Sequence, residues 1–131
     1  MATPPRFRDV ESIVTSWLMQ ELPDIDIWGE RPQDTDWQTL TETVAAVIFT
    51  ATSPFRAVVL DDRVFHVEVW GRDSVAAFDA AADVAQTLER LPGRDGVYSV
   101  KASAPKPFPD DDAAGRARYL VTCEITARAA D

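Results

Sequence analysis

The sequence has very little of the chemistry that catalytic and metal sites require. Its 131 residues include one cysteine, Cys123, and one histidine, His66. A single cysteine excludes an intramolecular disulfide and is typical of a reducing compartment. Basic residues are also outnumbered, because 13 lysines and arginines stand against 22 aspartates and glutamates, for a net charge of −9. A surface this acidic repels phosphate, so we expect no nucleic-acid reader that binds by counterion release.

Long apolar runs are missing as well. None approaches the roughly twenty residues that a membrane helix needs. Residues 1–8 lack the apolar segment of a signal peptide, and we expect loose tails there and at residues 129–131. Hydrophobic residues make up 46% of the chain and charged residues 27%, which is typical of a folded globular protein. We therefore expect a single domain over residues 1–131.

Two segments have the spacing of amphipathic helices. The first begins after Asp9, whose carboxylate can cap the free amides of the first turn, and ends at Leu22. Its apolar face consists of Val10, Ile13, Val14, Trp17 and Leu18. The second begins after Asp73 and runs to about Leu91. Its polar stripe consists of Asp79, Asp83, Gln86 and Arg90. The rest of that helix is alanine-rich and wider than one sheet contact requires, so a second partner for it is plausible.

The remaining apolar segments predict strands at residues 25–29, 44–51, 64–71, 98–103 and 119–126. The first should be a short edge strand. In 64–71 the period of two should bury Phe65, Val67 and Val69 and leave His66, Glu68 and Trp70 on a wetter face. The last two strands should point two sets of side chains inward: Tyr98, Val100 and Ala102, then Tyr119, Val121, Cys123 and Ile125. Between them, residues 105–118 form a polar loop that is too long for a tight hairpin.

This order of elements, α-β-β-β-α-β-β, predicts an α+β fold. No strand–helix–strand unit repeats often enough for a doubly wound parallel sheet. The simplest arrangement packs both helices on one face of a mainly antiparallel sheet of four to five strands. The opposite face would then carry His66, Glu68, Lys101, Thr122 and Glu124.

The candidate reactive residues do not converge on a catalytic site. Alternation places Cys123 and His66 on opposite faces of the sheet, and it makes Cys123 a buried, inert thiol. His66 and Glu68 share a face and could form an acid–base pair, but a solvated sheet face is the favoured interpretation because no pocket is implied. The run Asp110-Asp111-Asp112 lacks the alternate spacing and the terminal glutamate of a calcium loop. We therefore expect no enzyme, no metal and no cofactor.

Two groups of residues are candidates for contacts with other proteins. Residues 52–62, closed by a turn at Asp61-Asp62, hold more apolar side chains than a solvated loop should. Together with two alanines of the second helix they form a hypothetical subunit interface: Phe55, Val58, Val59, Leu60, Ala77 and Ala81. A hypothetical docking loop is formed by Asp110, Asp111, Asp112 and Arg116.

Two stretches and the order of elements resemble a known family. The stretch F-H-V-E-V-W-G-R-D, residues 65–73, is similar to a family strand that leads straight into the second helix. The stretch P-D-D-D-A-A-G-R-A-R-Y-L-V-T-C-E-I-T, residues 109–126, is similar to the family's Pro-Asp loop, Gly, Arg-Tyr and final strand. The chain thus resembles, over residues 9–128, the tail terminator (tail-completion) proteins of bacteriophages with long non-contractile tails, the group that includes the minor tail protein of lambda. Residues 34–43 depart from the proline- and glycine-rich loop of that family.

The resemblance implies a homohexameric ring on the head-proximal end of the tail tube. Such a ring stops tube polymerisation and joins the tail to the head connector, so its partners would be its own copies, the tube protein and the connector protein. It would be made in the host cytoplasm and reside in the virion. DNA would pass through the acidic lumen without specific binding. Each interface in the ring would join two different surfaces of the same chain.

Two alternatives remain at this point. A head-completion or neck protein is also a small ring-forming domain. A small α+β enzyme or ligand-binding domain would instead use the sheet face of His66, Glu68, Lys101 and Glu124.

Overall fold

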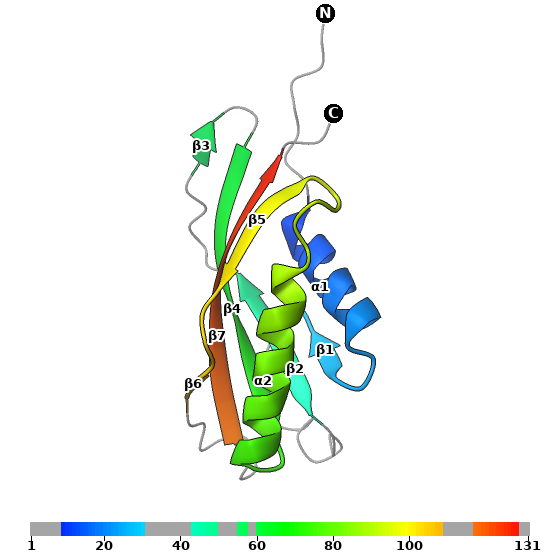
Figure 1. Ribbon diagram of the computed structural model, residues 1–131, viewed down its shortest axis with the longest axis vertical. Coiled ribbons are helices and arrows are strands. Elements are labelled where there is room, and N and C mark those ends of the chain that lie inside the picture. Colours follow the sequence, from blue (N-terminus) through cyan, green and yellow to red (C-terminus); the bar gives the residue numbers. More distant parts are fainter. Residues whose placement is uncertain (1–8, 31–42, 50–54, 58–59, 109–116, 129–131) are drawn as a thin grey trace, which may run out of the picture.

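A computed structural model describes residues 9–30, 43–49, 55–57, 60–108 and 117–128 of the chain (Figure 1). The elements in chain order are α1 (Val10–Glu21), β1 (Asp26–Trp28), β2 (Val44–Phe49), β3 (Phe55–Ala57), β4 (Leu60–Gly71), α2 (Ser74–Glu89), β5 (Val97–Ala102), β6 (Lys106–Pro107) and β7 (Ala117–Arg128). The fold is α+β, with both helices and all five expected strands in place. The two expected tails lie outside the described residues.

The strands of the described residues form one seven-stranded sheet in the order β1-β2-β4-β7-β5. The short strands β3 and β6 pair with β4 and β7 respectively. All pairings are antiparallel except β1 with β2, which is parallel, so the sheet is mixed. The prediction of four to five strands missed β3 and β6, because pieces of three and two residues are too short to show an alternation.

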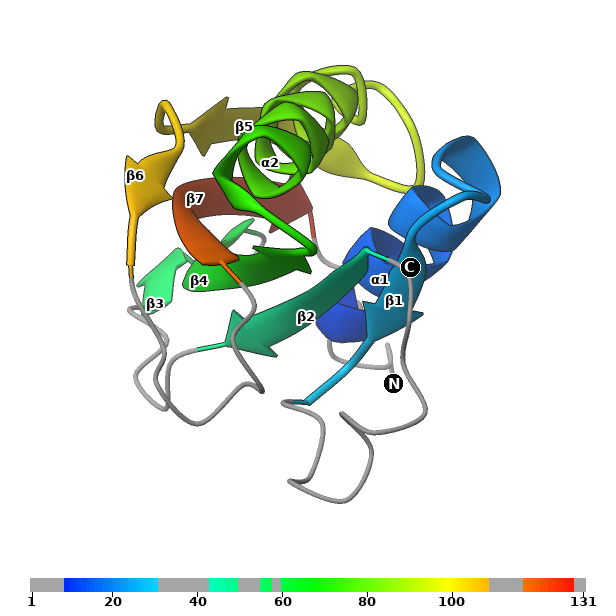
Figure 2. The same ribbon diagram turned by 90° about the horizontal axis from the view of Figure 1, so that it is seen from below.

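Both helices lie on the same side of the curved sheet, as predicted (Figure 2). Each begins at the expected cap, since Asp9 accepts from the amide of Ser12 at 3.1 Å and Asp73 accepts from the amide of Ala76 at 2.8 Å. The side chains of Val10, Val14, Trp17 and Leu18 are buried, and the four residues of the predicted polar stripe of α2 are exposed. The indole of Trp17 donates to the carbonyl of Thr87 at 2.8 Å and thereby joins the two helices.

The long strands β4 and β7 form the centre of the sheet. They pair along their whole length, from Leu60 with Arg128 to Gly71 with Ala117. The turn expected at Asp61-Asp62 was therefore wrong. Both residues continue β4, and the Asp62 carboxylate accepts from the Thr126 hydroxyl at 2.6 Å across the strands. Pairing with a twelve-residue neighbour outweighs the local turn preference of two aspartates.

The predicted phase of β5 was wrong at its start. Val97 pairs with Ala127 and Ser99 with Thr126, so Tyr98 is the extra residue of a β-bulge. Tyr98 is consequently 58% exposed, and Val97 takes the buried position at 2% exposure. In β7 the expected alternation is confirmed, with Val121, Cys123 and Ile125 buried.

The face of the sheet away from the helices is only partly exposed to solvent. Lys101, Thr122 and Glu124 are exposed there, as predicted. Glu68 and Trp70 were expected on a wetter face, yet they are only 2% and 0% exposed. Trp70 packs with Val44 and Ala46 in a second apolar cluster, separate from the main core. Alternation correctly assigned the face of these residues, but not their burial.

Candidate interaction surface

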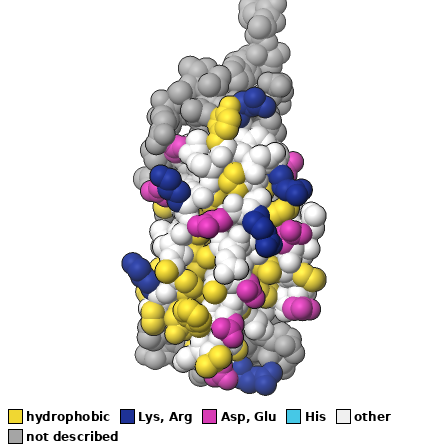
Figure 3. Space-filling view, viewed as in Figure 1, with side chains coloured by type: hydrophobic (Ala, Val, Ile, Leu, Met, Phe, Trp, Pro, Cys, Tyr) yellow, Lys and Arg dark blue, Asp and Glu magenta, His cyan; other side chains and the backbone are white. Residues whose placement is uncertain are grey.

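Exposed apolar side chains gather at the end of the molecule where α2 and β7 begin. Figure 3 shows them together beside α2 and over β6, at the lower left of the view. We call this surface the end patch and define it by three residues: Val75, Phe78 and Tyr119. Val75 and Phe78 are 70% and 44% exposed. Tyr119 is partly buried and contacts Phe78 edge-to-face, with 5.5 Å between ring centroids.

The backbone explains why these residues meet. Gly71 at the end of β4 pairs with Ala117 at the start of β7, and α2 begins three residues later at Ser74. A Cβ atom at Gly71 would lie 2.5 Å from the backbone nitrogen of Ala77, so only glycine allows α2 to start this close to the sheet. Val75 and Phe78 then lie one turn apart on the same flank of the helix. That flank adjoins the start of β7.

On the face of the sheet away from the helices, an arginine contacts Phe108, which is 42% exposed. Arg118 of β7 donates from Nη1 to Glu68 Oε1 at 2.6 Å and from Nε to the carbonyl of Phe108 at 2.6 Å. The amide of Phe108 donates back to the carbonyl of Arg118 at 2.9 Å. The guanidinium carbon lies 4.0 Å from the centroid of the Phe108 ring and 5.9 Å from that of Trp70. We call Glu68 and Arg118 the buried pair; their side chains are 2% and 7% exposed.

The sheet face considered as an acid–base site carries His66, Glu68, Lys101 and Glu124, and each of these residues has its own neighbours. The Glu68 carboxylate is buried and accepts from Arg118, so it serves a structural contact. His66 is partly buried and lies between Ile48 and Thr122 of the neighbouring strands. Lys101 and Glu124 face each other across β5 and β7 and are exposed. Within the described part of the chain, no three histidine, cysteine, aspartate or glutamate residues are grouped as metal ligands would be.

Cys123 is fully buried, as the alternation predicted. Burial raises the pKa of its thiol to about 12, and the negative charge of Glu89 acts in the same direction. The thiol therefore stays protonated at neutral pH. A protonated, enclosed thiol is a poor nucleophile and a poor metal ligand.

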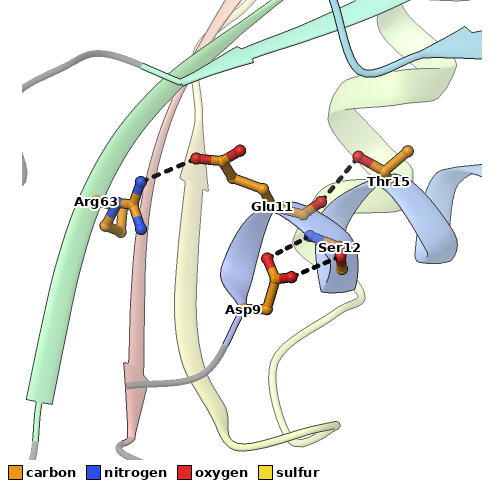
Figure 4. A network of polar contacts seen from close by, with 5 residues as sticks. All are labelled: Asp9, Glu11, Ser12, Thr15 and Arg63. Carbon is orange, nitrogen blue, oxygen red and sulfur yellow. Dashed lines mark hydrogen bonds and ion pairs between the residues drawn. The ribbon is translucent and has the colours of Figure 1, made fainter. Parts of the chain in front are cut away.

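A small cleft of about 220 Å³ lies between α1 and the end of β2, lined by Glu11, Ser12, Thr15, Ser16, Gly29, Val47 and Phe49. Figure 4 shows the polar groups beside it. Arg63 of β4 pairs with Glu11 at 3.1 Å, and the hydroxyls of Ser12 and Thr15 donate to Asp9 and to the carbonyl of Glu11. The amide and hydroxyl of Ser12 lower the pKa of the Asp9 carboxyl. These hydroxyls stabilise the first turns of α1.

The residues of the hypothetical subunit interface fall into three groups. Ala77 and Ala81 are fully buried and pack against the protein's own sheet, so the exposed flank of α2 is formed by Val75 and Phe78 instead. Phe55 lies in β3 and Leu60 begins β4, which places both in a hairpin pairing rather than in a free loop. Val58 and Val59 lie outside the described residues.

The four residues of the hypothetical docking loop, Asp110, Asp111, Asp112 and Arg116, also lie outside the described residues. Arg118, which the sequence placed at the end of the same polar loop, belongs to β7 and is buried. The end patch was missed for a related reason. Its only sequence signal was the breadth of the apolar surface on the second helix, and Tyr119 joins it through tertiary structure.

The sequence matches no protein-family model and has no significant match among curated proteins. Neither α1 nor α2 is long and apolar enough to cross a membrane.

Proposed function

We propose that this protein is a structural assembly protein of the tail terminator type, which acts through contacts between copies of itself and with neighbouring virion proteins. It would form a homohexameric ring on the head-proximal end of the tail tube, end tube growth and join the tail to the head connector. On this proposal the protein catalyses no reaction, and DNA passes through the ring without specific binding. The observation that carries an assembly role is the end patch.

The end patch has the composition of a protein–protein contact. Aromatic side chains dominate binding energies at interfaces, because they bury a large apolar area at a low cost in side-chain entropy. Phe78 is 44% exposed, stands on α2 and contacts the ring of Tyr119 on β7. Contiguous exposed apolar surface of this kind often marks an interaction site on a soluble protein. We assign the end patch to the contact with a second copy of the chain.

The resemblance in residues 65–73 and 109–126 supplies the kind of assembly. One feature of the described structure agrees with it, since β4 leads into α2 through only Arg72 and Asp73. In a closed ring the end patch of one copy would meet a different surface of the next, because rotational symmetry other than a twofold axis produces heterologous interfaces.

Removal of apolar side chains from the end patch tests the assembly role. The double variant Val75→Ser/Phe78→Ser should keep the fold, since both side chains are largely outside the core, and should lose the oligomer. Tyr98→Ser is the matched control, because Tyr98 is 58% exposed but lies on the bulge of β5 rather than in the end patch. Native mass spectrometry and sedimentation velocity over a concentration series measure the oligomer, and circular dichroism measures the fold.

We expect a hexamer for wild type and for Tyr98→Ser, and a folded monomer for the double variant. A wild type that stays monomeric at every concentration, or a control that loses the oligomer equally, would contradict the assignment. A separate binding experiment, with purified tail tubes and with heads, distinguishes a terminator from a neck protein. A terminator binds the ends of purified tail tubes, whereas a neck protein binds heads that carry a portal, and electron microscopy shows which is decorated.

A ligand-binding domain is the second candidate, and the cleft beside α1 is the observation that favours it. Its volume of about 220 Å³ is below the roughly 300–1,000 Å³ of typical ligand pockets. The hydroxyls of Ser12 and Thr15 also donate within their own helix. Thermal-shift screening of wild type against Val47→Trp, which would fill the cleft, tests this candidate. A ligand that raises the melting temperature of wild type alone would favour it over the assembly role.

A further inference from the structure

The segment from Ala104 to Phe108 runs along the outer edge of β7 and contains the short strand β6 (Figure 1). We call residues 104–108 the strap. Its residues are exposed except for Pro105, which is partly buried. Pro105 and Pro107 have no amide hydrogen to donate to a neighbouring strand. The attachment of the strap to the sheet therefore depends largely on its two ends.

The two ends of the strap are attached in different ways. Just before it, the amide of Ser103 donates to the carbonyl of Thr122 at 2.8 Å, and the amide of Thr122 donates to the hydroxyl of Ser103 at 3.0 Å. At the far end, the amide of Phe108 donates to the carbonyl of Arg118 at 2.9 Å. Nε of Arg118 donates in turn to the carbonyl of Phe108 at 2.6 Å. The far end thus depends on the side chain of one arginine.

The ring of Phe108 lies against the buried pair. The guanidinium carbon of Arg118 is 4.0 Å from the centroid of this ring. The Arg118 side chain is only 7% exposed, whereas Phe108 is 42% exposed. The same guanidinium donates from Nη1 to Glu68 Oε1 at 2.6 Å. Displacement of the Phe108 ring would therefore let water reach the charged groups of the pair.

The electrostatics of the buried pair oppose such an opening only weakly. Two opposite charges removed from water gain little net stability, because desolvation offsets most of their attraction. When water reaches the pair, the attraction weakens but both charges recover hydration. The closed strap is thus held mainly by the contacts of Phe108. Exposed segments with few buried contacts are those that open locally while the rest of a protein stays folded.

We propose that the strap is a lid that opens and closes over the buried pair while the rest of the sheet stays folded, with Arg118 as its latch. Ser103 is the fixed end of the lid and Phe108 is the moving end. The closed lid presents an aromatic ring on the outer face of the sheet, and the open lid presents the carboxylate of Glu68 and the guanidinium of Arg118. This inference does not rest on the proposed function, because the lid requires no other chain.

Native-state hydrogen exchange followed by NMR tests the lid in the wild-type protein. The Phe108 amide proton and the Arg118 Nε proton take part in the same latch, so one opening event exposes both. Both should be protected on the order of a hundredfold less than the amide of Ser103. Low concentrations of urea should reduce the protection of Ser103, whose exchange requires a larger unfolding. The protection of Phe108 should stay nearly unchanged, because the lid exposes little surface when it opens.

Variants of the latch test the role of Arg118. Arg118→Lys keeps a positive charge beside Glu68 but lacks the planar fork of donors, so protection of the Phe108 amide should fall about tenfold while that of Ser103 stays unchanged. Phe108→Leu removes the contact between ring and guanidinium and should lower protection at the same amide by about threefold. Lys106→Ala is the matched control, because Lys106 is an exposed residue of the strap itself. It should leave the protection of Phe108 unchanged.

Three results would overturn the inference. Equal protection of Phe108 and Ser103 in the wild type would mean that the strap opens only together with the sheet. Equal loss of protection at both amides in Arg118→Lys would mean that Arg118 supports the whole fold rather than a latch. A loss in Lys106→Ala as large as that in Arg118→Lys would mean that the contacts of Arg118 are not what closes the strap. None of these results bears on the oligomeric state, so failure of the lid and failure of the proposed function are distinguishable.

Discussion

The two faces of the sheet bury their side chains in different ways. On the inner face, Phe65, Val67 and Val69 of β4 meet the helices and are fully buried in an apolar core. On the outer face, the alternate residues include Glu68 and Trp70, which are buried as deeply although neither α1 nor α2 lies there. The inner face is thus stabilised chiefly by buried apolar area. The outer face combines a small apolar cluster with a charged pair, so single substitutions there should act through electrostatics.

Disruption of the buried pair should have the largest effect on stability. Arg118→Ala removes the guanidinium that pairs with the buried Glu68 carboxylate, and loss of one partner of a buried ion pair costs about 3–5 kcal/mol. Replacement of both partners, as Glu68→Leu/Arg118→Met, should cost distinctly less because no charge is left behind. Urea unfolding of both proteins measures the difference. A double variant as unstable as Arg118→Ala would mean that shape, rather than charge, governs the outer face.

Truncation of the inner face should have an intermediate effect. Val67→Ala and Val121→Ala should each lower the free energy of unfolding by about 1–3 kcal/mol, through lost burial and the cavity that remains. His66→Ala is the neighbouring control on the outer face and should change it by less than about 0.5 kcal/mol. Unchanged urea midpoints for both valine variants would contradict the register of β4 with β7. If His66→Ala lowered the free energy of unfolding as much as the valine variants do, the two faces would not differ in their contribution to stability.

The smallest effect at neutral pH concerns Cys123, a buried thiol of the inner face. Its pKa is raised from 9.0 to about 12 in the folded chain, so the unfolded chain loses this proton first as the pH rises. The stabilisation is fully present below pH 9 and should decline between about pH 9 and pH 12. The difference in unfolding free energy between wild type and Cys123→Ala should therefore be constant up to pH 9 and change above it. A thiol that reacts rapidly with iodoacetamide at pH 8 in the folded protein would contradict this.

Much of the fold could be predicted from local pattern. The caps Asp9 and Asp73 and the spacing of apolar residues located both helices, and alternation located the inward faces of β4 and β7 correctly. These features depend on neighbours in sequence, so the sequence contains the whole signal. The errors at Asp61-Asp62 and Tyr98 arose where a partner strand decides the outcome, by continuing a ladder in one case and by adding a bulge in the other.

The candidate site could be predicted far less well. The sequence by itself determined that the chemistry is sparse, with one thiol and one imidazole on opposite faces, and that the second helix has more apolar surface than a sheet covers. Only the tertiary structure decided that Ala77 and Ala81 belong to the core, while Val75 and Phe78 remain outside. It also brought Glu68, Phe108 and Arg118 together, although Glu68 and Phe108 are 40 positions apart in the sequence. The physical reason is that burial and ion pairing depend on which strands become neighbours, whereas capping and periodicity depend on the next few residues of the chain.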